Sequence, residues 1–86
     1  MVSRQHKELQ REASQITTDG FPQRLRRLRE RRQLNRAALG ELCGLSKDII
    51  RKYERGERKP SVDSLQTLAD FFDVTTDYLL GRKIFP

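Results

Sequence analysis

Apolar residues recur at intervals of three and four along most of the chain, which is the spacing of one helix face. Phe21, Leu25 and Leu28 predict a first helix over about 22–32. The arginines of this helix are expected on its remaining, outward side: Arg24, Arg26, Arg27, Arg31 and Arg32. A proline in the first turn is compatible with this start, because its missing N–H would have no helical partner there. No stretch alternates apolar and polar residues as a half-buried strand would. The pattern therefore indicates an all-α fold.

A second, shorter helix is predicted over the stretch "RAALGELC". Asn35 precedes it and is a favourable N-cap. Ala38, Leu39 and Leu42 are expected to point inward. Gly40 in the middle of a helix disfavours it by roughly 0.5–1 kcal/mol relative to alanine. We therefore expect another helix to cross close to this glycine.

A tight turn and a third helix follow. Gly44 suits the left-handed conformation that ends helices, and Ser46 is the next N-cap. The third helix is expected over about 46–55, with Ile50 and Tyr53 on its buried face. Two helices joined by so short a glycine-containing turn form a helix-turn-helix, whose second helix can enter the DNA major groove.

Two further helices complete the predicted fold of five. Ser61 caps a fourth helix that runs to about residue 72, and Thr75 caps a short fifth helix, "TDYLL". The buried stripe of the fourth helix consists of Leu65, Leu68, Ala69 and Phe72. The chain then divides into an N-terminal extension (1–20), flexible or partly helical, a helical domain (21–81) and a tail (82–86).

The charges are segregated along the chain, whose formal net charge is +6. Residues 24–59 carry thirteen Lys or Arg against five Asp or Glu, whereas residues 60–81 carry four Asp and no Lys or Arg. One side of the molecule should therefore be strongly positive. Binding to a polyanion is the usual physical reason for such a distribution.

The residues that could support other functions are few. Cys43 is the sole cysteine and is expected to pack as a small hydrophobe, in a reduced, cytoplasmic protein. His6 is the sole histidine, so neither a metal site nor a nucleophile–base pair is expected, and we expect no cofactor and no enzymatic activity. No apolar run reaches the length needed to span a membrane, and no membrane partner is expected.

Three segments at characteristic spacing resemble the lambda-repressor-like (Xre/Cro-type) helix-turn-helix DNA-binding family. They are "RLRRLRERRQLNRAAL", "GLSKDIIRKYERGERKPS" and "LQTLADFFDVTTDYLLG". The resemblance covers residues 21–81. It implies a five-helix domain that binds double-stranded operator DNA, usually as a homodimer on a near-palindrome.

The resemblance also implies roles for individual residues. The positions expected to contact bases are Lys47, Asp48, Arg51 and Lys52. The positions expected to contact phosphates are Asn35, Arg36, Arg55, Arg58 and Lys59. Arginine and lysine can donate to guanine O6 and N7, and aspartate can accept from cytosine N4. An aspartate in a first helical turn can equally serve only the helix dipole, so both roles stay open for Asp48.

Two positions of the third helix, Ile49 and Glu54, need separate interpretation. Arg29 and Glu54 match a family ion pair that links the first helix to the third; the alternative is an exposed pair of little consequence. Ile49 stands where the family commonly has a small polar residue. It could contact a thymine methyl group or be covered by protein.

The leading hypothesis is a sequence-specific DNA-binding transcriptional regulator, a repressor acting as a homodimer. The alternative is an antitoxin-like or adaptor module in which DNA binding is secondary and a protein partner binds through residues 1–20 or 82–86. Ile84 and Phe85 in the tail are apolar residues that the helical pattern leaves unexplained. They could pair across a dimer axis or pack on their own domain.

Overall fold

The computed structural model describes residues 19–86 of the chain. The predicted extension over 1–20 therefore lies outside the described residues except for its last two positions. The described part contains five helices and no strand: α2 (Phe21–Arg31), α3 (Arg36–Cys43), α4 (Lys47–Glu54), α5 (Val62–Phe72) and α6 (Thr76–Leu79). The prediction of an all-α, five-helix domain is confirmed.

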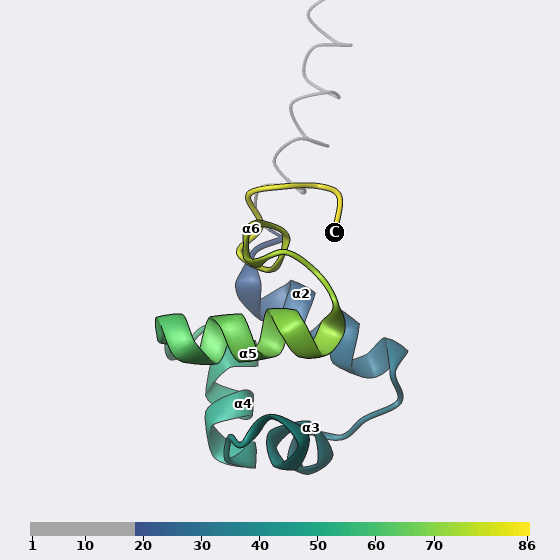
Figure 1. Cartoon of the computed structure of the whole chain (residues 1–86). Helices are drawn as coiled ribbons and strands as arrows, with labels where there is room; N and C mark the ends of the chain where they lie inside the picture. Colours follow the sequence, from purple (N-terminus) through teal and green to yellow (C-terminus); the bar gives the residue numbers. More distant parts are fainter. Residues whose placement is uncertain (1–18) are drawn as a thin grey trace, which may run out of the picture.

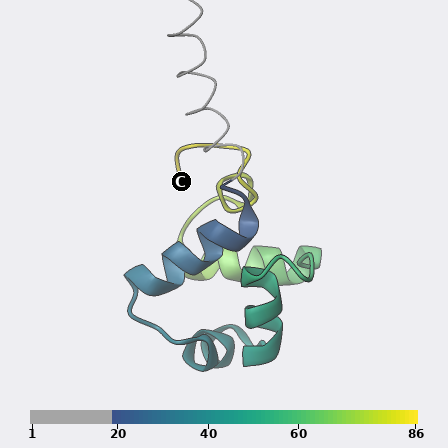
Figure 2. The same cartoon turned by 180° about the vertical axis from the view of Figure 1, so that it is seen from behind.

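The helices fall into two ends joined by a middle layer. In both views, α2 and α5 lie in the middle, α3 and α4 form one end, and α6 with the C-terminal tail forms the other (Figures 1 and 2). Because α2 packs on α4 and α5 packs on α3, the middle layer holds this pair in place. The tail lies at the end of the molecule that is remote from this pair.

Side-chain caps start the last four helices at the residues predicted for them. An oxygen of each cap accepts a hydrogen bond from a backbone N–H three residues later, at 2.7–3.1 Å. These caps are Asn35, Ser46, Ser61 and Thr75. Each one satisfies an N–H that the first turn of a helix leaves without a partner, which is worth about 0.5–2 kcal/mol.

The core takes one fully buried aliphatic side chain from every helix in the described part. These are Leu25, Leu39, Ile50, Leu68 and Leu79. Burying a side chain of this size stabilises the fold by about 1.5–3 kcal/mol, so each helix contributes to holding the others. Tyr53, as predicted, and Tyr78 are also buried, and Tyr53 packs edge-on against Phe21.

Two residues lie on the opposite side from the one predicted. Leu42 was expected to point inward, but it is 59% exposed. The inward line of α3 passes through Leu39 and Cys43, four residues apart, and leaves Leu42 beside it. Arg24 was expected among the outward arginines, but it is only 4% exposed. It falls three residues after Phe21, on the buried stripe of α2.

The close neighbour of Gly40 also differs from the prediction. We expected a crossing helix, but the closest atoms belong to the turn that follows α3. A Cβ at position 40 would overlap the Leu45 carbonyl oxygen and stand 3.2 Å from the carbonyl carbon of Ser46. Glycine is therefore required here because the chain folds back on itself, not because another helix passes.

Candidate nucleic-acid interface

The turn between α3 and α4 fixes the angle of α4. Gly44 ends α3 with φ 69°, the left-handed conformation that favours glycine. The Leu45 N–H then donates to the Gly40 carbonyl at 2.7 Å, which closes the end of α3. Ser46 caps α4 directly afterwards. Since three consecutive residues make the whole connection, α4 has little freedom to change its direction relative to α3.

The start of α4 meets the start of α3 at an open hollow of about 350 Å³. It is lined by Arg36, Lys47, Asp48 and Arg51. All four were predicted to contact DNA, and the fold brings them together although they come from two helices. Three cations and one carboxylate around a hollow form a surface that a polyanion can enter. Lys52 is half-buried on α4 and does not line this hollow.

Asp48 and Arg51 contact each other within this group. Arg51 Nη2 donates to Asp48 Oδ1 at 3.1 Å, and both side chains reach solvent. Asp48 also lies in the first turn of α4, where a negative charge favours the helix dipole.

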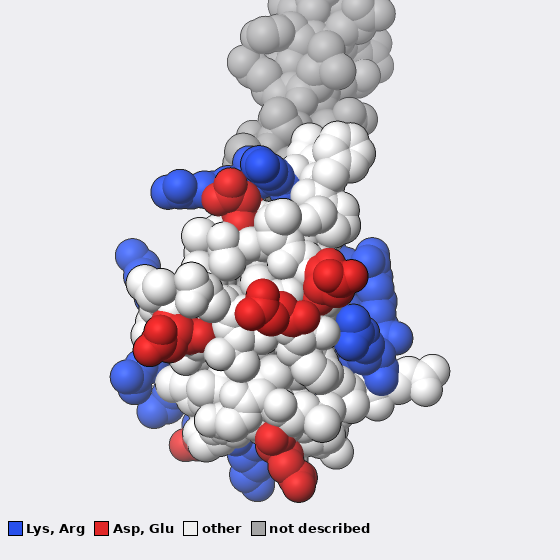
Figure 3. Space-filling view, in the orientation of Figure 1, with Lys and Arg blue, Asp and Glu red and all other residues white. Residues whose placement is uncertain are grey.

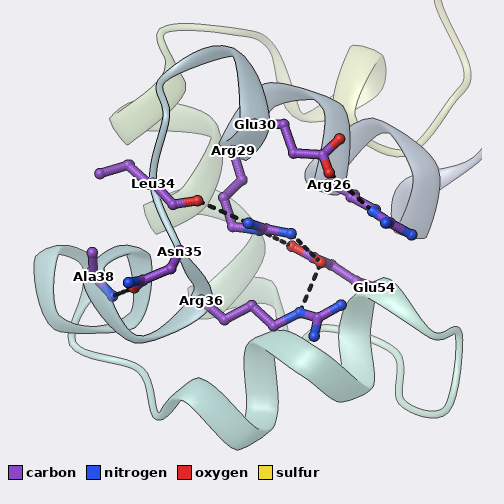
Figure 4. A network of polar contacts seen from close by, with 8 residues as sticks. All are labelled: Arg26, Arg29, Glu30, Leu34, Asn35, Arg36, Ala38 and Glu54. Carbon is purple, nitrogen blue, oxygen red and sulfur yellow. Dashed lines mark hydrogen bonds and ion pairs between the residues drawn. The ribbon is translucent and has the colours of Figure 1, made fainter.

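Glu54, at the last turn of α4, is held by arginines from two other helices (Figure 4). Its side chain is only 1% exposed. Arg29 donates to both of its carboxylate oxygens, at 2.6 and 3.0 Å, and also to the Leu34 carbonyl at 2.8 Å. Arg36 donates to Glu54 Oε1 at 3.1 Å. The hydrogen bond to Glu54 raises the pKa of Arg29 further above its usual value.

This arrangement ties α2, α3 and α4 together through one carboxylate. The sequence indicated the Arg29–Glu54 pair, but not the second arginine. Arg36 was expected only to hold a phosphate, and in the structure its guanidinium is already bonded to Glu54. Its side chain remains 36% exposed, so it faces both the carboxylate and solvent. Asn35 uses its side-chain oxygen to cap α3, which leaves its amide NH₂ as a donor.

The loop after α4 carries the remaining cations. Arg55, Arg58 and Lys59 are all exposed, and Arg55 pairs with Glu57 at 2.9 Å. Arg58 and Lys59 border a second, mainly apolar hollow of about 550 Å³ between this loop and α5. The predicted phosphate contacts are thus divided between two places, the start of α3 and this loop.

The acidic residues gather elsewhere. In the orientation of Figure 1, Asp and Glu side chains run across the face formed by α5, with Lys and Arg at its margins (Figure 3). Asp63, Asp70 and Asp73 belong to α5 or its end. The acidic segment over 60–81 thus places aspartates on the α5 face, which would repel DNA.

Two apolar residues near the interface are partly covered by protein. Ile49 packs against the edge of the core and is half-buried, so protein covers part of the side chain. Cys43 is half-buried as well, and burial raises the pKa of its thiol. A thiol held in its protonated form reacts slowly, which agrees with its expected role as a packing residue.

Arg24 forms a cluster that the sequence did not indicate. Its guanidinium donates to three backbone carbonyls, those of Asp19 at 2.8 Å, Tyr78 at 3.1 Å and Lys83 at 2.8 Å. It also stacks over the Tyr78 ring, 4.4 Å from the centroid. Nearby, Arg27 donates two hydrogen bonds to the Asp19 carboxylate and lowers its pKa. The cluster fixes the beginning and the end of the described chain to α2.

A helix-turn-helix family model matches residues 25–79 of the chain. The HTH-type transcriptional regulator AnsR of Bacillus subtilis (strain 168) is 42% identical over 60 residues, covering 70% of this chain and 52% of AnsR. The HTH-type transcriptional activator BcrR of Enterococcus faecalis is 37% identical over 63 residues, covering 73% of this chain and 31% of BcrR. The chain thus spans about half or less of the length of these relatives.

A solved structure resembles the described fold. The crystal structure of the P22 c2 repressor protein of Salmonella phage P22, in complex with a synthetic operator, superposes with a TM-score of 0.70 at 32% identity. The match covers 73% of this chain and 96% of that one. Among residues 19–86, no helix is both long and apolar enough to cross a membrane.

Proposed function

Because the chain belongs to the lambda-repressor-like helix-turn-helix family, we propose that it is a transcriptional regulator that binds a specific double-stranded operator. The observation that carries the proposal is the hollow where α3 and α4 begin, lined by three cations from two helices that a three-residue turn holds in place. In this proposal, α4 enters the major groove and α3 lies across the backbone. A regulator of this kind acts in the cytoplasm, where the DNA is.

Base contacts are assigned to the exposed side of α4. Lys47 and Arg51 are four residues apart and share one helix face, which points into the hollow. Both can donate to guanine O6 and N7. Lys52, half-buried one position further on, reaches a base edge or the adjacent phosphate. Asp48 lies in the first turn of α4 beside Lys47, one turn before Arg51.

Phosphate contacts are assigned to both ends of the interface. Asn35 offers its side-chain NH₂ and the free N–H groups of the α3 N-terminus. Arg55, Arg58 and Lys59 hold the backbone from the exposed loop beyond α4. Such contacts fix the register of the protein on DNA without reading its sequence.

Arg36 can take part in phosphate binding although it is bonded to Glu54. Arg29 donates to both oxygens of that carboxylate, so Glu54 keeps two charge-assisted hydrogen bonds if Arg36 turns away. A phosphate at the α3 N-terminus would then compete for a guanidinium that is already oriented toward solvent on one side. The proposal is that Arg36 exchanges part of its contact with Glu54 for a phosphate.

A homodimer bound to a near-palindromic operator completes the proposal, with repression as its outcome. The tail over 82–86 is the proposed dimer contact. Its backbone is fixed through hydrogen bonds to the Lys83 and Pro86 carbonyls, yet Ile84 is 60% and Phe85 81% exposed. Apolar side chains held out in this way favour contact with a second molecule over packing on their own domain.

Operator selection from random DNA, followed by a salt titration, tests this function. Four phosphate-contacting Arg or Lys residues in each protomer give eight in a dimer, so log K should fall with log salt at a slope of about −7. Equal binding to all sequences would overturn sequence-specific regulation. Binding that is insensitive to salt would overturn the assigned phosphate contacts.

The exposed tail also favours a second candidate function, an antitoxin-like or adaptor module. In that case, Ile84 and Phe85 would bind a different protein instead of a second copy. Purification from the native source distinguishes the two, because the second candidate requires a stable heterocomplex that deletion of residues 82–86 abolishes. DNA binding by the purified chain alone would leave the first candidate standing.

A further inference from the structure

The ion pair between Asp48 and Arg51 lies on the part of α4 that the proposed function places against bases. One hydrogen bond of 3.1 Å joins Arg51 Nη2 to Asp48 Oδ1. Arg51 is 38% and Asp48 65% exposed, so solvent screens the pair and it contributes little to folding. Its effect is on the position of the Arg51 guanidinium.

An arginine reads guanine by donating two N–H groups in a fixed fork to O6 and N7. An unrestrained arginine side chain has many rotamers, and ordering it opposes binding. The contact with Asp48 occupies one of the five N–H donors of Arg51 and leaves four, including one on Nη2 and both on Nη1. The fork therefore remains available while its direction is restrained.

We propose that Asp48 is a positioning residue for Arg51, that Arg51 reads a guanine, and that Asp48 itself contacts no base. This inference rests on the proposed function. It replaces the direct base contact that the family resemblance implied for Asp48. It also gives a reason for a carboxylate in a hollow otherwise lined by Arg36, Lys47 and Arg51, where a negative charge weakens the general attraction to DNA.

Asp48 could also serve only the dipole of α4, without positioning Arg51. α5 and α6 also carry an aspartate at their second residue, where it favours the helix dipole. Asp63 holds that position in α5 and is exposed. The substitution D63N thus removes the same charge from the same helical position, and it is the matched control for D48N.

The test measures affinity of the full chain for the selected operator and for every single base-pair variant of it. Wild type, D48N, R51A, the double variant D48N/R51A and D63N are compared at one salt concentration. We expect wild type to prefer G·C at one position by about 5- to 150-fold, and R51A to lose that preference. D48N should reduce the preference at the same position by about threefold or more, with non-specific affinity unchanged or higher. In the R51A background, D48N should have no further effect on base preference. D63N alone should leave the base preference of the wild type unchanged.

Each other outcome has a definite meaning. If D48N changes the preference at a different base pair, and the change persists without Arg51, Asp48 reads a base directly and the inference is wrong. If D48N behaves like D63N, the residue serves only the helix dipole and the inference is again wrong. A wild-type profile that is flat at all positions overturns the proposed function itself, and the positioning role with it.

Discussion

Gly40 and Leu45 lie so close that no side chain fits between them. The Leu45 N–H donates to the Gly40 carbonyl at 2.7 Å, and a methyl group on Gly40 would overlap the Leu45 carbonyl oxygen. The contact is between backbone atoms, which cannot move aside as the end of a flexible side chain could. The angle between α3 and α4 thus depends on the absence of one carbon atom.

Replacing Gly40 by alanine should therefore destabilise the fold. Alanine gains about 1 kcal/mol in helix propensity, but overpacking of a closely packed site costs about 1–3 kcal/mol, and here the obstacle is backbone. We expect a net loss of about 1–2 kcal/mol in the free energy of unfolding, measured by urea denaturation, and weaker operator binding. Gly44→Ala is the comparison, because only its positive φ opposes the substitution and no atom lies within 4 Å of the added carbon. A G40A protein as stable as wild type would contradict the close packing.

Removing Arg29 should be the most damaging change in the interface. Arg29→Ala leaves Glu54 almost completely buried with one arginine, itself partly exposed, as its remaining partner. Breaking a buried pair from one side costs about 3–5 kcal/mol, a large part of the stability of a domain this size. Thermal unfolding followed by circular dichroism checks this. A loss below about 1 kcal/mol would show that the pair behaves as an exposed one.

Arg36→Ala should separate DNA binding from stability. Because Arg29 retains both Glu54 oxygens, we expect a stability loss of only about 0–1 kcal/mol. Affinity for operator and non-operator DNA should fall alike, and the salt slope should become shallower by about 1 for each protomer. Fluorescence anisotropy at several salt concentrations measures both quantities. A loss confined to one base pair would mean that Arg36 reads sequence.

Asp19 should make stability depend on pH in acid. Two hydrogen bonds from Arg27 lower the pKa of Asp19 below its usual value of 3.8, so its contribution is present above pH 3.8 and is lost as the pH falls through the folded-state value. Both side chains reach solvent, which limits the contribution to less than about 1 kcal/mol. Asp19→Asn should lower stability at pH 7 and lower it less near pH 2, because the native carboxylate becomes protonated as the pH falls through its lowered pKa. An equal effect at both pH values would exclude the ionic contribution.

If the proposed homodimer forms through the tail, deleting residues 82–86 should leave a monomer in light-scattering measurements. The double variant Ile84→Ser/Phe85→Ser is the control, since it keeps the Lys83 carbonyl that Arg24 binds. Both variants should bind an isolated half-site as wild type does, and the complete operator more weakly. An unchanged dimer in the double variant would remove these two side chains from the interface.

The parts of the fold that follow local rules could be predicted from the sequence. Caps such as Ser46 and Thr75 start helices at the expected residues, because a hydroxyl can accept a hydrogen bond from the backbone N–H three residues later without help from the rest of the fold. One apolar residue in each stripe is fully buried, because the helical spacing of apolar residues already identifies the inward face. The family resemblance supplied the expected roles of the site residues in DNA contact, and these stay predictions.

The features that were missed depend on segments distant in sequence. The buried position of Arg24 depends on carbonyls up to 59 residues away. The bond between Arg36 and Glu54 spans 18 residues and requires that α3 and α4 first adopt their angle. Gly40 was correctly singled out, but the turn that excludes a side chain there becomes visible only once the chain has folded back.

One guanidinium, that of Arg24, holds the carbonyls of residues 19 and 83 at the same time. Residues 19 and 83 thus lie close together, on the end of the described domain away from α3 and α4. Such a unit can be inserted into a surface loop of a host protein without forcing the host strands or helices apart. A short linker from 83 back to 19 would likewise allow new termini to be opened elsewhere. The arginine that fixes the tail thus also makes the helix-turn-helix domain suitable for insertion into other proteins.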